Sequence, residues 1–571
     1  MQLFSWLAIA VGAVLFFLSH PNPVFQNGFF LFGFFALLPV FLSVRTSSFK
    51  TVWLKGFVYG ILSYGASCYW LSSYNPFTLY IALGFYALIL ALVFSLLKIC
   101  DLALCRFRQG RFFAFAFFAQ AFIWCAYEYV KTLGFLGFSY GVLGYSQWKN
   151  LPLLQNASWG GVWPLSLACA LVSASFAAIL FSLHSFRKGG AVTSGAAVRK
   201  ALLANRICLS LTIFFLLFML SYGLVTLSLV GGPSSTPVKK VKVICIQNNA
   251  DSEKYELDVY KRDVKALIEL SKEALSQNPD AALVVWPETA VVPPVEYHYQ
   301  KRIDYDRVEI INRLLEFLAG KDCAFVIGNQ RTVEKSPFSA DDYNAALVFD
   351  SSLGNVIPPK PFFYQKIHLI PFAEYFPYRK LAPGLYKKLL LGNDRLWTPG
   401  SEYTVFNVRS VKFSVPICFE DTFGSLCRRF VLEGAEAFVN ISNDSWSLSI
   451  PCQKQHLAMS VFRCAENRIP CARSTASGVT AFVDRFGRVV STTAPLEMNF
   501  LAAEMELPSQ ESTKSLYTRM GDWFALSILF AGCAILALSL LYFFLGSLKS
   551  RAESKRQKAE SPRLAKDGKK R

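Results

Sequence analysis

The sequence contains few acidic residues and very few histidines. Its 571 residues include 39 Asp and Glu, 58 Lys and Arg, and only five His, so the formal net charge is +19. Charged residues make up 17% of the chain and hydrophobic residues 53%, against roughly 45–50% apolar residues in soluble domains. This combination of basic excess and apolar mass favours a membrane protein, and we expect no nucleic-acid partner.

Several well-known motifs are also missing. The chain has no HExxH, GxxxxGK[ST] or GxGxxG sequence, so the zinc protease, P-loop and Rossmann classes lack their signatures. The fourteen cysteines form no CxxC pair and are spread along the whole chain, which excludes a small disulfide scaffold. We therefore expect no metal and no cofactor.

Long apolar runs, in contrast, are abundant. A helix that crosses a bilayer needs about 20 predominantly apolar residues. We predict eight such helices, at 3–19, 28–44, 53–73, 79–99, 112–130, 160–183, 208–230 and 523–546. The first run lacks the basic start and the cleavage site of a signal peptide, so we expect it to be retained.

The loops between these runs predict the orientation. The second, fourth and sixth loops are rich in basic residues, which include Arg45, Lys50, Lys98, Arg106, Arg187 and Arg199, whereas the first and third loops have none. Basic loops stay in the cytoplasm. We therefore expect both termini to be cytoplasmic and the long segment between the last two helices to lie outside.

The order of segments predicts five parts. These are a seven-helix membrane domain at 1–230, a linker at 231–238, a soluble domain at 239–508, the last transmembrane helix at 523–546 and a basic tail at 547–571. The tail holds ten basic and three acidic residues. It is expected to be disordered and either to bind anionic lipid or to act only as a topology anchor.

The segment 239–508 shows a different periodicity from the membrane runs. Short strand-like runs occur at 241–247, 282–286, 323–328, 345–350, 411–417, 437–442 and 479–484, and amphipathic helical patterns lie among them. Strands interleaved with helices predict an α/β domain.

Three segments of this domain carry residues suited to catalysis. Glu288 follows a buried strand and Pro287, so it is expected at the sheet edge where α/β domains bind ligands. Lys366 lies in an aromatic loop and needs an acidic neighbour if it is desolvated. Cys418 ends a strand just before a helix-like run, a position that favours a thiolate. Each residue alone has a plain structural explanation, so the indication comes from the ordered set.

The motifs around these residues resemble a known family. WPE (286–288), KIHLIPFAEYFP (366–377) and ICFED (417–421) are similar to the nitrilase, or carbon-nitrogen hydrolase, superfamily, and specifically to the apolipoprotein N-acyltransferase family. The resemblance covers nearly the whole chain. It implies eight transmembrane helices and a nitrilase-like αββα sandwich between the seventh and the eighth.

The resemblance also implies roles for individual residues. Glu288, Lys366 and Cys418 match the catalytic triad, and Glu374 and Glu420 match two supporting acidic residues. Four positions match the substrate-binding residues: Tyr255, Asn344, Phe419 and Trp446. The family often has Trp at 255 and Tyr at 419, and it usually has Phe-Gly where Ser447 and Leu448 follow the tryptophan. These departures concern the shape of the lipid pocket.

The implied function is N-acylation of lipoproteins. A membrane phospholipid would donate a fatty acyl chain, Cys418 would hold it as a thioester, and the α-amino group of a diacylglyceryl-modified N-terminal cysteine would receive it. The resemblance places such a protein in the bacterial inner membrane, with the catalytic domain in the periplasm. We expect a monomer.

Three alternatives remain open from the sequence. The same triad would serve a membrane-tethered amidase or hydrolase of the nitrilase type. A Cys-His hydrolase is disfavoured because none of the five histidines stands in a thiol-protease motif. A transporter is disfavoured because the membrane runs contain no array of charges.

Overall fold

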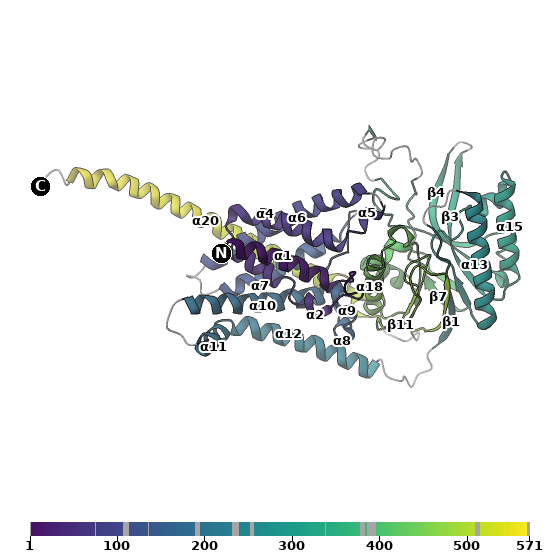
Figure 1. The fold of residues 1–571 in the computed structure, drawn as a ribbon, viewed down its shortest axis with the longest axis horizontal. Helices are drawn as coiled ribbons and strands as arrows, with labels where there is room; N and C mark the ends of the chain where they lie inside the picture. The colour runs from purple at the N-terminus through teal and green to yellow at the C-terminus, as the bar shows by residue number, and fades with distance from the viewer. Residues whose placement is uncertain are drawn as a thin grey trace.

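The computed structural model describes residues 2–74, 76–106, 113–134, 136–188, 194–230, 239–251, 256–336, 339–376, 383–384, 396–508 and 514–567. A helical bundle forms one end of the molecule and an α/β domain forms the other (Figure 1). The chain leaves the bundle after helix α12, builds the α/β domain, and returns to the bundle as α20.

The bundle contains a helix in every predicted apolar run. Its helices are α1 (Gln2–Ser19), α2 (Phe30–Gly33), α3 (Leu38–Thr46), α4 (Phe49–Ser67), α5 (Leu71–Tyr74), α6 (Pro76–Arg106), α7 (Phe113–Lys131), α8 (Leu151–Leu154), α9 (Ala157–Gly160), α10 (Trp163–Lys188), α11 (Ser194–Ala204), α12 (Arg206–Val225) and α20 (Trp523–Asp567). The predicted helix over 28–44 is present in two pieces, with turns at 34–37 between α2 and α3. Pro39 cannot continue a helix from the preceding turn, and α3 instead begins with this proline in its first turn.

Four of the described helices are long and apolar enough to cross a membrane. They cover Leu79–Cys105, Trp163–Arg187, Arg206–Ser228 and Trp523–Leu545, and shorter apolar helices cover Leu3–Ser19 and Phe30–Thr46. Large apolar side chains on α12 and α20 face outward, among them Phe214 at 71% and Phe530 at 73% exposure. Such surfaces are typical of helices that contact lipid.

The basic tail does not have the expected disorder over 547–567. These residues continue α20 as a helix that extends beyond the bundle (Figure 1). The segment is rich in Lys, Arg and Ala, which are strong helix formers. It also extends an existing helix, so the unfavourable nucleation step is avoided.

The α/β domain is built on two six-stranded sheets, in the orders β12-β1-β2-β3-β4-β5 and β11-β10-β9-β8-β7-β6. The strands are β1 (Lys240–Gln247), β2 (Leu283–Val285), β3 (Ala324–Ser336), β4 (Ser339–Asp350), β5 (Phe362–Gln365), β6 (Phe406–Val408), β7 (Val411–Ser414), β8 (Ala437–Ser442), β9 (Cys471–Thr475), β10 (Ala481–Val483), β11 (Val489–Thr492) and β12 (Asn499–Glu506). The predicted α/β fold class is confirmed, although β5, β6, β9, β11 and β12 were not predicted.

The sheets form the middle of a four-layer sandwich. Helices α13 (Leu257–Gln277) and α15 (Tyr305–Ala319) lie on the side away from the bundle, and α18 (Ile450–Asn467) lies between the second sheet and the bundle (Figure 1). Helix α14 (Val295–Lys301) contacts α15, and α17 (Gly424–Leu432) contacts α18. Side chains of β1 alternate accordingly. Val243 and Cys245 pack in the large inner core, while Ile244 and Ile246 pack with α13 and α15.

Strand ends position the candidate catalytic residues. Glu288 follows β2, Lys366 follows β5 and Cys418 follows β7. Gly328 of β3 passes so close to the turn after β2 that a Cβ atom on it would lie 2.6 Å from the Cα atom of Glu288. The absence of a side chain at Gly328 therefore lets the Glu288 turn lie against β3.

Replacing this glycine should disturb the turn that holds Glu288. We expect Gly328→Ala to lower the free energy of unfolding by about 1–3 kcal/mol, the range for overpacking a core, measured as a lower melting temperature in detergent. Gly320→Ala is the matched control, because a Cβ atom there would meet no atom closer than 3.8 Å. Equal melting temperatures for the two variants would contradict this account of Gly328.

Candidate active site

Cys418 lies at a tight turn after β7. The residue adopts a φ of +50° and begins a single 3-10 turn, Cys418–Thr422. A non-glycine residue in this left-handed region carries strain of about 1–2 kcal/mol, which persists only where the surroundings impose it. The side chain is 5% exposed.

Glu288 is held by three hydrogen bonds. Its Oε1 accepts from Nδ2 of Asn344 at 2.8 Å and from Nζ of Lys366 at 3.1 Å, and its Oε2 accepts from the backbone N–H of Asn443 at 2.8 Å. The donors come from β4, from the segment after β5 and from the segment after β8. The carboxylate therefore joins the two sheets at one point.

Lys366 lies between two carboxylates. Its buried ammonium donates to Oε1 of Glu288 and, at 2.9 Å, to Oε1 of Glu374. Glu374 is itself fixed by the N–H of Ile370, at 2.8 Å. Burial alone would lower the pKa of Lys366, but Glu288, Glu374 and Cys418 raise it well above its ordinary value. The ammonium therefore stays protonated.

Cys418 lies close enough to the Glu288 carboxylate and the Lys366 ammonium for both charges to affect the pKa of its thiol. Burial and the Glu288 carboxylate raise the pKa of the Cys418 thiol well above its ordinary value, and the Lys366 ammonium opposes this rise only in part. The expectation that this turn favours a thiolate is therefore wrong for the resting site. A short 3-10 turn follows the cysteine, and α17 begins only at Gly424.

Glu420 ties the Lys366 segment to the cysteine turn. Its Oε1 accepts from the N–H groups of Ile367 and His368, at 2.8 and 3.0 Å, and from the hydroxyl of Tyr364 at 2.8 Å. Its Oε2 accepts from the N–H of Ile417 at 2.8 Å. The carboxyl is completely buried, and this burial raises its pKa to about 7.

The remaining candidate residues have different positions. Asn344 donates to Glu288 and, at 3.2 Å, to Glu374, so it orients both carboxylates. Phe419 packs edge-on against Phe423 with ring centroids 5.0 Å apart. Trp446 packs edge-on against Trp70 of the bundle, at 5.7 Å. Tyr255 lies outside the described residues.

A buried charged cluster behind Cys418 was not predicted. His456 of α18 contacts Oδ1 of Asp421 at 2.8 Å through Nε2, and Oδ1 of Asp444 at 3.0 Å through Nδ1. Arg473 donates to the second oxygen of each aspartate, at 2.5 and 3.1 Å. A charged residue inside an otherwise buried run, such as Arg473 in β9, was the feature of the sequence that could have predicted this cluster.

The cluster supports the backbone of the cysteine turn. Nε2 of His456 lies 3.3 Å from the carbonyl oxygen of Cys418. Burial and Arg473 lower the pKa of His456, but Asp421 and Asp444 raise it more, to about 9. A protonated imidazole with a carboxylate on each side has no lone pair to take a thiol proton, so this geometry does not favour the Cys-His alternative.

The helical bundle contacts the segments that build the site. Ser139 donates to the carbonyl oxygen of Thr422 at 3.1 Å, and Nε1 of Trp70 donates to Oε1 of Gln455 at 3.3 Å. The buried Arg463 of α18 donates to the hydroxyl of Tyr145 at 3.1 Å. The cysteine turn and α18 are thus held from the membrane side.

Both parts of the chain match families of known proteins. Residues 12–175 match the family model described as apolipoprotein N-acyltransferase N-terminal domain, and residues 255–515 match the one described as carbon-nitrogen hydrolase. The second match includes all the candidate catalytic residues and supports a nitrilase-like α/β domain.

Curated relatives match over nearly their full length. Apolipoprotein N-acyltransferase 1 of Treponema denticola is 35% identical over 96% of this chain and 98% of its own. Apolipoprotein N-acyltransferase 1 of Treponema pallidum is 39% identical over 89% of this chain and 90% of its own. A solved nitrilase-superfamily structure, Saccharomyces cerevisiae Nit3, has 18% identity and a TM-score of 0.35, covering 48% of this chain and 93% of that chain.

The protonated His456 should make part of the stability depend on pH. Its folded pKa of about 9 exceeds the ordinary value of about 6.5. This stabilisation is therefore fully present below pH 6.5 and is lost as pH rises through 9. We expect His456→Gln to be less stable than the wild type at pH 6. The difference between their free energies of unfolding should be smaller at pH 10 by about 3 kcal/mol.

His298 provides the control for this pH dependence. Burial and Arg307 lower its pKa. Any stability that the His298→Gln variant loses should therefore not be greatest at low pH. A constant gap between wild type and His456→Gln across pH 6–10 would contradict a protonated His456.

Proposed function

Because the chain belongs to the apolipoprotein N-acyltransferase family and thus acts in lipoprotein N-acylation, we propose that Glu288, Lys366 and Cys418 are its catalytic residues. One observation carries this proposal. A buried ammonium joins the buried carboxylate of Glu288 and the partly buried carboxylate of Glu374 beside a buried thiol, and a carboxylate-ammonium-thiol set of this kind can exchange a proton without solvent. Glu374 and Glu420 are proposed to hold this set in place.

The first half-reaction would load the enzyme. Glu288 takes the proton of the Cys418 thiol, and the resulting thiolate attacks an ester carbonyl of a membrane phospholipid. Lys366 and the N–H groups near Phe419 stabilise the oxyanion. The carbon-oxygen bond breaks, protonated Glu288 returns its proton to the leaving alkoxide, and a lysophospholipid departs. The acyl chain remains on Cys418 as a thioester.

The second half-reaction would release the acyl chain. The α-amino group of the diacylglyceryl-modified cysteine of a lipoprotein attacks the thioester, and Glu288 accepts its proton. The carbon-sulfur bond breaks, and Cys418 leaves as a thiolate and regains a proton from Glu288. A thioester is reactive enough toward an amine that the transfer needs neither ATP nor a metal.

The charges around Cys418 support this route. Free ionisation of the thiol would add a charge to a buried site and is opposed by its raised pKa. Transfer of its proton to Glu288 leaves the total charge of the group unchanged. It also leaves the Lys366 ammonium, still paired with Glu374, next to the new negative charge.

We further propose eight membrane spans with both termini in the cytoplasm and the catalytic domain in the periplasm. The four long apolar helices support this arrangement, as do the basic loops on one side. Figure 1 shows the start of α1 at the end of the bundle that lies opposite the α/β domain. The proposed domain limits are 1–230, 231–238, 239–508, 523–546 and 547–571.

A transferase and a hydrolase with the same triad differ in their product. We propose incubating the purified enzyme with a phospholipid that carries a tagged acyl chain, with and without a diacylglyceryl lipopeptide that has a free amine. We expect tagged amide with the lipopeptide and little free acid without it. Double-reciprocal rate plots should be parallel, as a ping-pong mechanism with two half-reactions requires.

Two variants sharpen this measurement. Cys418→Ala should form neither product, whereas Cys427→Ala, which changes another buried cysteine on α17, should retain the activity. Release of tagged free acid at the same rate with and without lipopeptide would contradict the transferase and favour the membrane-tethered hydrolase.

A further inference from the structure

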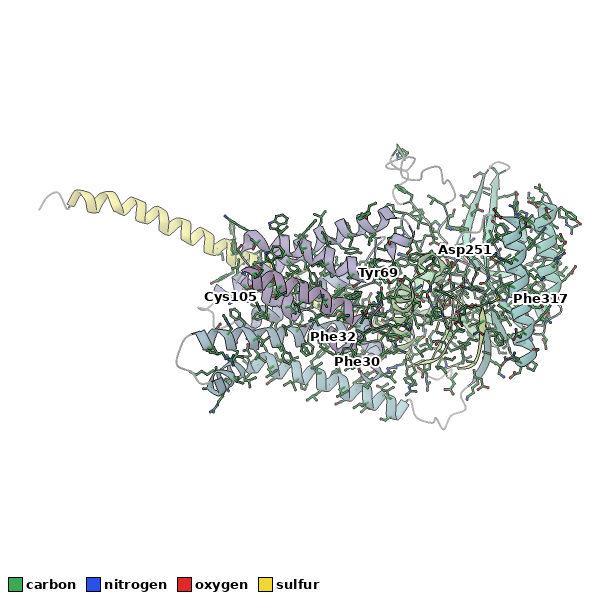
Figure 2. All side chains as sticks on the ribbon, in the orientation of Figure 1. Phe30, Phe32, Tyr69, Cys105, Asp251 and Phe317 are labelled. Carbon is green, nitrogen blue, oxygen red and sulfur yellow. The ribbon has the colours of Figure 1, made fainter. Side chains whose placement is uncertain are left out.

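A cavity of about 400 Å³ lies where the bundle meets the catalytic domain. Three segments line it: the loop between α1 and α2 with Gln26, the turn before α5 with Tyr69, and residues 447–451 at the start of α18. The hydroxyl groups of Tyr69 and Ser449 are 3.2 Å apart. Figure 2 shows Tyr69 at the boundary between the helices of the bundle and the α/β domain.

Two lysines lie beside the loop that contributes Gln26 to the cavity, outside the lining itself. Nζ of Lys454, on α18, donates to Oε1 of Gln26 at 2.9 Å. Nζ of Lys149 lies 4.2 Å from the ring centroid of Trp148, whose Nε1 donates to the carbonyl oxygen of Asn27 at 2.8 Å. Both ammonium groups are thus fixed through neighbouring residues of one loop.

The lysine pair has no acidic counterpart. In the described part of the chain, neither Lys149 nor Lys454 has a carboxylate within 4.0 Å, whereas Lys272 and Lys301 of the α/β domain each have one. Burial and the charge of Lys454 lower the pKa of Lys149. Like charges held near each other with no carboxylate between them are suited to an anion.

The surroundings of the cavity indicate what kind of anion would bind there. The side chain of Leu448 is 73% exposed at the cavity, and that of Val24 in the lining loop is 67% exposed. An anion bound here would therefore have apolar groups attached to it. The position at the ends of the apolar helices, with Trp148 beside the lysines, is that of an interface between lipid and water.

One short segment of the chain contributes both to the cavity and to the candidate active site. Residues 447–451 directly follow Trp446 and lie only a few positions after Asn443, whose N–H binds Glu288. In a glycerophospholipid, the phosphate and the ester carbonyls are attached to the same glycerol unit. A phosphate bound beside this segment would hold the ester near the part of the chain that also contacts Glu288.

We propose that the rim of this cavity binds the phosphodiester headgroup of the phospholipid donor, with Lys454 and Lys149, which lie next to its Gln26 side, as the phosphate ligands. The proposal rests on the proposed function and extends it, because it explains why a phospholipid and not a neutral diacylglycerol would be the donor. The same chemistry would accept inorganic phosphate, and we commit to the lipid because exposed apolar side chains border the cavity.

The kinetic test uses the full-length enzyme in a neutral detergent. Phosphatidylethanolamine and a diacylglycerol with the same acyl chains are compared as donors, so that only the headgroup differs. For Lys149→Gln/Lys454→Gln we expect about a tenfold higher KM for phosphatidylethanolamine, a kcat within about twofold of the wild type, and an unchanged KM for diacylglycerol. Lys272→Gln/Lys301→Gln, on α13 and α14, is the matched control and should change neither value.

A binding measurement separates this proposal from the catalytic one. In a Cys418→Ala background, no turnover occurs, and the affinity for dihexanoyl phosphatidylethanolamine is measured directly. We expect the double lysine substitution to weaken this binding about tenfold. Unchanged binding, an equal loss for dihexanoylglycerol, or lysine-dependent binding of inorganic phosphate alone would each overturn the headgroup site, whatever the outcome for Cys418.

Discussion

The site depends on one ammonium that is buried between two carboxylates. Lys366 donates to Glu288 and Glu374, and the three side chains are fixed by Asn344 and by the N–H groups of Ile370 and Asn443. Removing Lys366 would leave two neighbouring carboxylates without their shared ammonium, which costs several kcal/mol. Because the donors come from both sheets, the sandwich has to be assembled before the charges can be satisfied.

The cysteine turn is imposed on the chain by a second set of buried charges. His456, Arg473 and the two aspartates form a closed group whose histidine contacts the Cys418 carbonyl. The cysteine itself keeps a left-handed backbone. The bundle adds its own contacts to this turn and to α18. The apolar helices of the bundle thus hold the cysteine turn and α18 at one end.

The sequence was sufficient for the fold class and for the residues at strand ends, but not for features that depend on distant partners. Glu288, Lys366 and Cys418 stand next to regular strand-like runs, so their local patterns were visible. β9 was missed because it contains Arg473, Ser474 and Thr475, which are buried only because partners elsewhere satisfy them. β12 was missed because most of its residues are partly or fully exposed. The role of His456 was not predicted because its partners Asp421 and Asp444 are 35 and 12 residues away along the chain.

The central claim is that the acyl chain passes through the sulfur of Cys418. Mass spectrometry of the intact protein, followed by peptide mapping, tests it most directly after incubation with phospholipid in the absence of an amine acceptor. The account predicts a single long-chain acyl adduct on Cys418 that hydroxylamine removes and that Glu288→Gln does not form. Formation of the amide product by an enzyme that never carries this adduct, or an adduct on a different residue, would contradict it.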